Sequence, residues 1–108
     1  MIVSFHWDEE YQPRPSQKQE YFAHLAIGSG ADLVIGHHPH NIQPVEKYAN
    51  SWIAYSLGNF VFDQGFSKET VEGLLLEIII ENKKIIAVNF KIIEISEFFQ
   101  PYLTQDNI

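Results

Sequence analysis

The sequence contains no cysteine, so its fold has no disulfide and any metal ion must be bound by other side chains. The remaining ligands are the nitrogen and oxygen atoms of His, Asp, Glu and Asn. Positive charge is also scarce, because seven Lys and Arg residues are outnumbered by fourteen Asp and Glu residues and the formal net charge is -7. This balance argues against a nucleic-acid-binding protein that relies on a generally basic surface. It is compatible with binding a cation, although it is also ordinary for a soluble protein.

Long apolar runs are absent as well. The longest, residues 73–76 and 78–80, are interrupted by Glu77 and fall far short of the roughly 20 apolar residues that cross a membrane. We therefore expect no membrane span in this segment. The 108 residues are 45% hydrophobic and 14% aromatic, which is typical of at most one globular domain with a modest core.

The first forty residues predict a strand, a helix and a second strand. Residues 2–5 and residues 33–35 are short apolar runs, and Ser16 can cap a helix between them with Gln19 three positions on. This order predicts two parallel strands joined by a crossover, so that both strands end at the same edge of the sheet. The apolar stripe expected on the helix is Tyr21, Phe22, Leu25 and Ala26.

The rest of the chain predicts extended segments. Residues 42–45 and 52–55 flank a turn, and residues 74–80 and 85–95 form a hairpin around a polar turn. The expected fold class is therefore α/β, with a strand-helix-strand unit followed by antiparallel strands and a C-terminal hairpin.

Three of the five histidines, His37, His38 and His40, directly follow the second predicted strand. Side chains two apart in an extended backbone point the same way, and Pro39 biases His38 toward that backbone. We therefore expect His38 and His40 to share one metal centre, with His37 facing away in a supporting role. His6, at the end of the first strand, is the natural third nitrogen. The alternative is that these histidines cap backbone groups or lie exposed in a loop.

Acidic residues follow the first strand at Asp8, Glu9 and Glu10, in a loop where functional residues commonly lie. A solvated turn is the alternative for Asp8 and Glu9. Ser56 stands in no nucleophile-elbow sequence, and no Gly-rich phosphate loop is present. The chemistry that remains is hydrolysis assisted by a divalent metal ion, or metal binding without turnover.

Motifs in a fixed order run through most of the chain. They are Phe5, His6, Trp7, Glu10 and Tyr11; Gln19 and Ala23; residues 30–36 with His38, Pro39 and His40; Gln43, Pro44 and Glu46; and residues 55–63. Together they resemble the CapA family of bacterial capsule-synthesis proteins, which is associated with poly-γ-glutamate. The resemblance continues through Gln100 and Pro101.

The resemblance implies a fold similar to the C-terminal portion of the calcineurin-like metallophosphoesterase α/β sandwich. It implies that His6, His38 and His40 bind a divalent metal ion, which would be manganese, iron or zinc. A bound phosphate ester or an anionic polymer would be the substrate, and no nucleic acid is expected as a partner.

The resemblance also assigns roles beside the metal. Glu10 matches an acid of the family signature and, with His38, would act in catalysis. His37 and Asn59 would support these residues. Asp8 stands where the signature usually has glycine, so it could tune the site, add a ligand or mark a diverged copy.

The family pattern includes an amino-terminal half with an aspartate-bearing strand and an Asn-Asn-His motif that has no counterpart here. We therefore expect residues 1–108 to be a single partial domain, the C-terminal half of a CapA-like domain. The missing N-terminal half, or a partner chain, would complete the site. The resemblance implies a membrane-anchored parent protein in the bacterial cell envelope. The alternatives are a non-catalytic polymer-binding or assembly subunit of a polyglutamate synthesis and export complex, and an inactive remnant.

Overall fold

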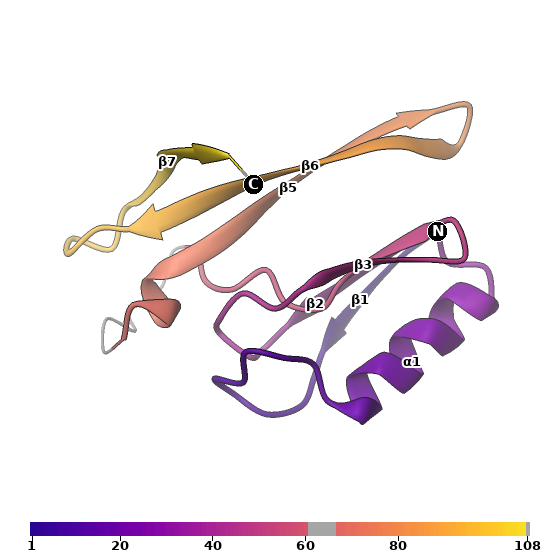
Figure 1. The fold of residues 1–108 in the computed structure, drawn as a ribbon, viewed down its shortest axis with the longest axis horizontal. Helices are drawn as coiled ribbons and strands as arrows, with labels where there is room; N and C mark the ends of the chain where they lie inside the picture. Colours follow the sequence, from indigo (N-terminus) through magenta and orange to yellow (C-terminus); the bar gives the residue numbers. More distant parts are fainter. Residues whose placement is uncertain (61–66, 108) are drawn as a thin grey trace.

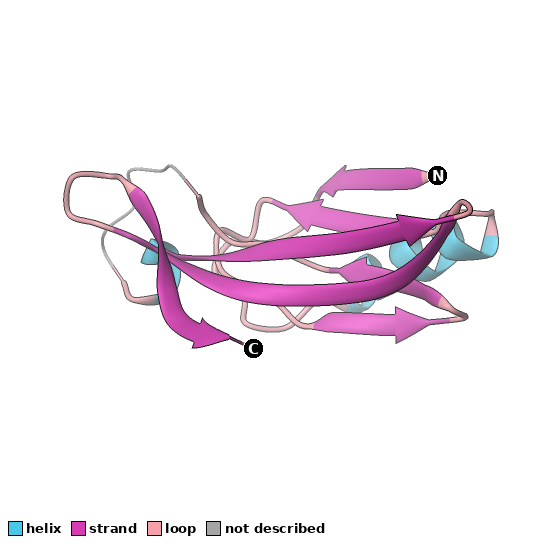
Figure 2. Cartoon of the chain, turned by 90° about the horizontal axis from the view of Figure 1, so that it is seen from above, coloured by secondary structure: helices cyan, strands magenta, loops and turns pink. Residues whose placement is uncertain are grey.

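In the computed structural model, the described part of the chain forms two β-sheets and one α-helix (Figure 1). The structure describes residues 1–60 and 67–107. Helix α1 lies on one face of a four-stranded sheet, and a three-stranded sheet lies over the other face (Figures 1 and 2). This mixture confirms the expected α/β class. The elements are β1 (Ile2–His6), α1 (Gln17–Gly28), β2 (Leu33–His37), β3 (Val45–Tyr48), β4 (Ser51–Ala54), a 3-10 turn (Glu69–Val71), β5 (Glu72–Glu81), β6 (Lys84–Ile95) and β7 (Pro101–Asn107).

The four-stranded sheet has the order β1-β2-β4-β3. Strands β1 and β2 are parallel, as their connection through α1 predicts, and His6 is the register partner of His37. Strand β4 is parallel to β2 on its other side, and β3 is antiparallel to β4. The carboxyl ends of β1 and β2 therefore meet at one edge of the sheet.

The second sheet, β5-β6-β7, contains the expected hairpin, since β5 and β6 are antiparallel neighbours. Backbone hydrogen bonds join the two sheets where the chain enters β5. The amide of Leu74 donates to the carbonyl of Leu57 at 2.7 Å, and the amide of Asn59 donates to the carbonyl of Glu72 at 3.2 Å. The entry of β5 is thus tied to the segment that follows β4.

Helix α1 begins as its sequence predicts. Ser16 accepts from the backbone amide of Gln19, and the Gln19 side chain accepts from the backbone amide of Ser16, which completes a capping box. The Gln19 amide then donates to Gln43 at 2.8 Å, so this polar residue is buried with its hydrogen bonds made. In the described parts of the chain, no helix is long and apolar enough to cross a membrane.

The face that α1 buries differs from the predicted one. Gln19, Ala23 and Ile27 point into the sheet. The helix packs through Ala23 because its small side chain lets the helix backbone approach the sheet. Beside Ala23, the hydrogen-bonded pair of Gln19 and Gln43 takes the place of an apolar contact. The expected stripe is wrong for three residues, Tyr21, Phe22 and Leu25, whose side chains are exposed.

The core between α1 and the sheet is organised around Trp7. Its indole stacks on Phe5, with ring centroids 4.5 Å apart, and its Nε1 donates to the carbonyl oxygen of Tyr55 at 3.0 Å. The indole crosses Gly36, where an added Cβ would collide with the Tyr55 carbonyl and lie 2.5 Å from Nε1. Glycine is required at position 36 because a larger side chain has no space. Its φ is not positive, so conformational freedom is not the reason.

A polar cluster joins α1 to strand β3. The Tyr55 hydroxyl donates to Glu46 at 2.6 Å, and His24 bonds the same Glu46 oxygen at 3.0 Å. The His24 ring also stacks on Tyr48 at 3.9 Å. His24 is therefore a packing residue. Burial alone would raise the pKa of Glu46, but the hydrogen bonds from Tyr55 and His24 and the charge of His24 outweigh it and lower that pKa.

Replacing Gly36 with Ala should destabilise the fold because the new methyl group has no space. We expect the free energy of unfolding to fall by about 3 kcal/mol, the upper end of the usual cost of overpacking. Urea denaturation measures this change. Gly28→Ala is the matched control, since nothing lies within 4 Å of its added Cβ, and it should be neutral or slightly stabilising. Equal losses at the two positions would contradict the steric explanation.

Tyr55→Phe should weaken the fold in a pH-dependent way. A lowered pKa for Glu46 means that its contribution to stability is present above its ordinary value of 4.5 and is lost as pH falls through the folded value. The difference in unfolding free energy between the parent and the variant should therefore be largest at neutral pH and shrink below pH 4.5. Urea titrations across this range test it. Tyr48→Phe, which keeps the ring stacked on His24, should show no such trend.

Candidate functional site

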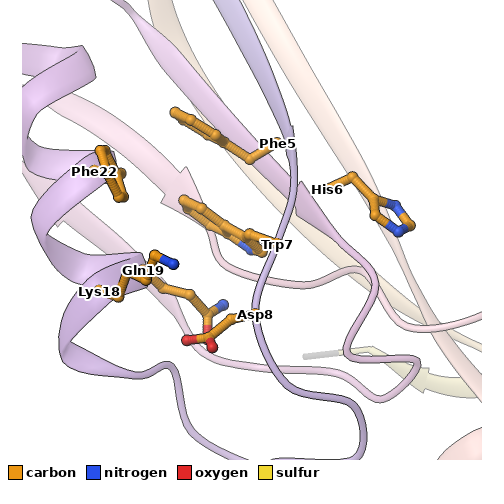
Figure 3. A pocket seen from close by; sticks show the side chains of 7 residues that line it. All are labelled: Phe5, His6, Trp7, Asp8, Lys18, Gln19 and Phe22. Carbon is orange, nitrogen blue, oxygen red and sulfur yellow. The ribbon is translucent and has the colours of Figure 1, made fainter.

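The candidate site lies at the carboxyl ends of β1 and β2. Alternation along β1 places Phe5 and Trp7 on the side of α1, and Figure 3 shows the ring of His6 on the opposite side of the strand. His6 and His37 are register partners on adjacent parallel strands, so their side chains share that opposite face. Packing of the aromatic core thus directs these two histidines away from the helix.

His37 is the register partner of His6, so the two side chains lie on the same face of the sheet. His37 lines a cavity of about 390 Å³ between the two sheets, together with Ile35 and apolar side chains of β5. Burial first, and then the charge of His6, lower the pKa of His37. Both effects disfavour the protonated form of His37. Its supporting role stays a prediction.

The structure brings together the three predicted nitrogen ligands. The ring centroids of His6 and His38 are 4.5 Å apart, and those of His38 and His40 are 5.5 Å apart. The backbone conformation that brings these rings together differs from the predicted one. His38 and His40 have φ values of 99° and 62°, so the backbone between them is not extended, and our expectation from Pro39 was wrong.

Backbone hydrogen bonds hold the loop after β1 against the loop after β2. The amide of Trp7 donates to the carbonyl of His37 at 3.0 Å, and the amide of Tyr11 donates to the carbonyl of Pro39 at 2.7 Å. Between these two ties, Glu10 Oε2 lies 4.0 Å from His40 Nε2. The predicted acid is therefore at the cluster.

Asp8 and Glu10 have separate environments although they are two residues apart. The Asp8 carboxylate accepts from the Ser16 hydroxyl at the start of α1, and Asp8 borders the pocket on the helix side of β1 (Figure 3). Asp8 thus joins the first loop to the helix cap. Of the roles left open for it, this position fits indirect tuning of the loop better than addition of a ligand.

Asn59 lies directly against His40. Its Oδ1 is 3.0 Å from His40 Nδ1, and its Nδ2 donates to the carbonyl of Thr70 at 2.9 Å. Asn59 is buried, as is Thr70. The contact agrees with the supporting role expected for Asn59. The sequence carried no sign that Thr70 anchors it.

The loops around the histidines contain unusual backbone conformations. Asp8, Tyr11, His38 and His40 all have positive φ values although none is glycine. Such conformations are energetically costly and persist where the surrounding structure enforces them, often at functional sites. Their concentration in the two loops supports the choice of this edge as the candidate site.

The donor types at this edge fit a divalent metal ion, because imidazole and carboxylate are ordinary ligands of manganese, iron and zinc. Their placement provides pairs: His6 with His38, His38 with His40, and His40 with Glu10. Within residues 1–60 and 67–107, no three His, Asp or Glu side chains are arranged to hold one ion together. Residues 61–63 of the motif lie outside the described residues.

A second cavity, of about 300 Å³, lies on the helix side of β1 (Figure 3). Its walls include the rings of Phe5, Trp7 and Phe22, and Lys18 borders it. The sequence analysis missed it, although the spacing of Phe5 and Trp7 was an available signal for two rings on one face. His6 also borders this cavity, although its ring lies on the other side of the strand (Figure 3).

Comparisons with known proteins agree on one family. The family model described as "Bacterial capsule synthesis protein PGA_cap" matches residues 1–64. The chain is 48% identical over 68 residues to the capsule biosynthesis protein CapA of Bacillus anthracis, covering 63% of this chain and 16% of that protein. It is 46% identical over 68 residues to the PGA biosynthesis protein CapA of Bacillus subtilis (strain 168), covering 63% and 18%. A probable polyglutamine synthesis accessory protein of Mycobacterium tuberculosis is 37% identical over 62 residues, covering 57% and 16%.

These matches confirm the resemblance to CapA over part of the chain. The family match ends at residue 64, so Gln100 and Pro101 lie beyond it. The chain spans less than a fifth of the length of each of these relatives. Because the family model covers 64 of the 108 residues, the chain belongs to the bacterial capsule synthesis protein family, PGA_cap.

Proposed function

We propose that this chain acts in capsule or poly-γ-glutamate biosynthesis, and that the histidine cluster is its chemical centre. The names of the relatives support the first part, since they refer to capsule, PGA and polyglutamine synthesis. The observation that carries the second part is the meeting of three imidazole rings and one carboxylate at the carboxyl ends of two parallel strands.

In this proposal, His6, His38 and His40 would contribute pairs of ligands to a site for a divalent ion of manganese, iron or zinc, and ligands from outside the described residues would complete it. Such an ion, when bound, lowers the pKa of water so that hydroxide is available near neutral pH. Glu10 is placed beside His40, where its carboxylate can hold a proton transferred from the reaction. The lowered pKa of His37 disfavours a positive charge beside His6.

The remaining ligands of a complete site would come from the N-terminal half of a longer polypeptide or from a partner chain. The substrate class that we propose is a phosphate ester or a related bond in an anionic polymer, as the metallophosphoesterase-like resemblance implies. A cation at the site would be important for such a substrate, because this chain has a formal net charge of -7 and would otherwise repel a polyanion.

Metal binding by the purified chain tests the proposal directly. Titration with Mn²⁺ or Zn²⁺, followed by calorimetry, should show that His38→Ala and His40→Ala each weaken binding at least about tenfold. His24→Ala is the matched control, because His24 is a histidine bonded to Glu46 outside the cluster, and its loss should leave the affinity unchanged.

Unchanged affinity in both cluster variants would overturn the metal assignment. A chelator-treated chain that holds no metal and still binds polyglutamate would favour a non-catalytic polymer-binding role instead. Hydrolysis of p-nitrophenyl phosphate by a protein of the relatives' full length, with and without His38→Ala, then tests whether the site turns over a phosphate ester.

A further inference from the structure

The side-chain amide of Asn59 has one donor end and one acceptor end, and the structure uses them on different partners. The Nδ2 group donates to the Thr70 carbonyl, so Oδ1 is the atom presented to His40 Nδ1 at 3.0 Å. An amide oxygen can only accept a hydrogen bond, so the histidine nitrogen opposite it must carry a proton. We infer that Asn59 is a positioning residue that holds neutral His40 as the Nδ1–H tautomer and leaves the lone pair on Nε2.

The orientation of the amide is fixed by its surroundings. Turning it over would place Oδ1 against the Thr70 carbonyl, and two acceptors would then face each other at the present 2.9 Å separation. Thr70 does not move aside easily, because it is buried and its hydroxyl donates to the Ser67 carbonyl at 2.9 Å. Only one orientation of Asn59 therefore satisfies both neighbours.

The backbone of Asn59 is held equally closely. Its amide donates to the carbonyl of Glu72, and an added Cβ at Gly73 would collide with its carbonyl oxygen. Strand β5, in the second sheet, thus packs against Asn59 and holds the side-chain amide of Asn59 beside His40. The tautomer of His40 is set by the packing of β5, through Asn59 and Thr70.

The tautomer matters because of what lies on the other side of the ring. His40 Nε2 is 4.0 Å from Glu10 Oε2. The opposite tautomer would point an N–H group toward that carboxylate and set a lone pair against the Asn59 oxygen. With Nδ1 protonated, Nε2 and Glu10 instead present electron pairs to the space between them, which suits a cation or a hydrogen-bond donor such as water.

This inference deepens the proposed function by naming the His40 atom that would act, and its test needs neither metal nor substrate. The test is a long-range proton–nitrogen NMR spectrum of the chain labelled with ¹⁵N-histidine, recorded without metal at a pH where His40 is neutral. The His40 signals are assigned by their loss in His40→Gln. His24 is an internal reference for a protonated Nε2, because its Nε2 is bonded to the acceptor Glu46.

In the parent chain, Nε2 of His40 should resonate as an unprotonated, pyridine-type nitrogen and Nδ1 as a protonated one. Asn59→Ala should move both His40 shifts toward a mixture of tautomers, while the His24 shifts stay in place. Asn59→Asp keeps an acceptor for Nδ1 and loses the donor to Thr70, so it should retain the tautomer while lowering stability. This pair of variants separates positioning from a merely structural role.

Asn41→Ala is the matched control, because Asn41 is an equally buried asparagine that donates to the Gln12 carbonyl. It should leave the His40 shifts unchanged. A protonated Nε2 in the parent spectrum would overturn the inference even if every Asn59 variant failed to fold, and so would unchanged shifts in a folded Asn59→Ala chain. Metal binding with the opposite tautomer would refute this inference alone, whereas the expected tautomer without metal binding would refute only the metal assignment.

Discussion

The hydrogen bond from the Trp7 indole to the Tyr55 carbonyl, passing over Gly36, is the contact on which the arrangement of the site depends. It joins β1 to the end of β4 across β2, and the bare backbone at residue 36 is what permits the crossing. Because successive side chains of a strand point to opposite faces of the sheet, this contact also decides on which face the neighbouring side chains lie. Because Trp7 and Gly36 are directed toward the helix, His6 and His37 are directed away from it. Packing of the core on one side decides where the histidines lie on the other.

Much of the fold could be predicted because its signals are local. Ser16 and Gln19 encode the start of α1 through their own hydrogen bonds, and short apolar runs of the correct length encode β1 and β2. The order of these elements was enough to infer a parallel pair, and hence that His6 would lie near the later histidines. The helix face was predicted wrongly because its choice depends on Gln43, which follows β2 and whose partnership with Gln19 no local pattern reveals.

The proximity of His6, His38 and His40 could be predicted from the sequence, but the conformation of the loop that carries them could not. Pro39 locally favours an extended His38, but the backbone bonds from Trp7 and Tyr11 to the loop that contains Pro39 impose a different path with positive φ at His38. Those bonds are tertiary, and a single sequence does not encode them in any short window. The same limit applies to Thr70, an ordinary threonine in sequence that becomes important only because its carbonyl meets the Asn59 amide.

The donor groups at this edge are imidazole nitrogens and one carboxylate, which suit a cation or a hydrogen-bond donor. Protonation of His37 is disfavoured by burial and by His6, so positive charge does not accumulate at that end of the cluster. At the other end of the cluster, the Glu10 carboxylate lies near Nε2 of His40. The side-chain oxygen of Asn59 contacts the other ring nitrogen, Nδ1. Lone pairs gathered in this way repel one another unless a cation or a hydrogen-bond donor lies among them. The two loops keep these groups together through backbone hydrogen bonds and strained φ values, so the fold itself bears the cost of holding them at one edge.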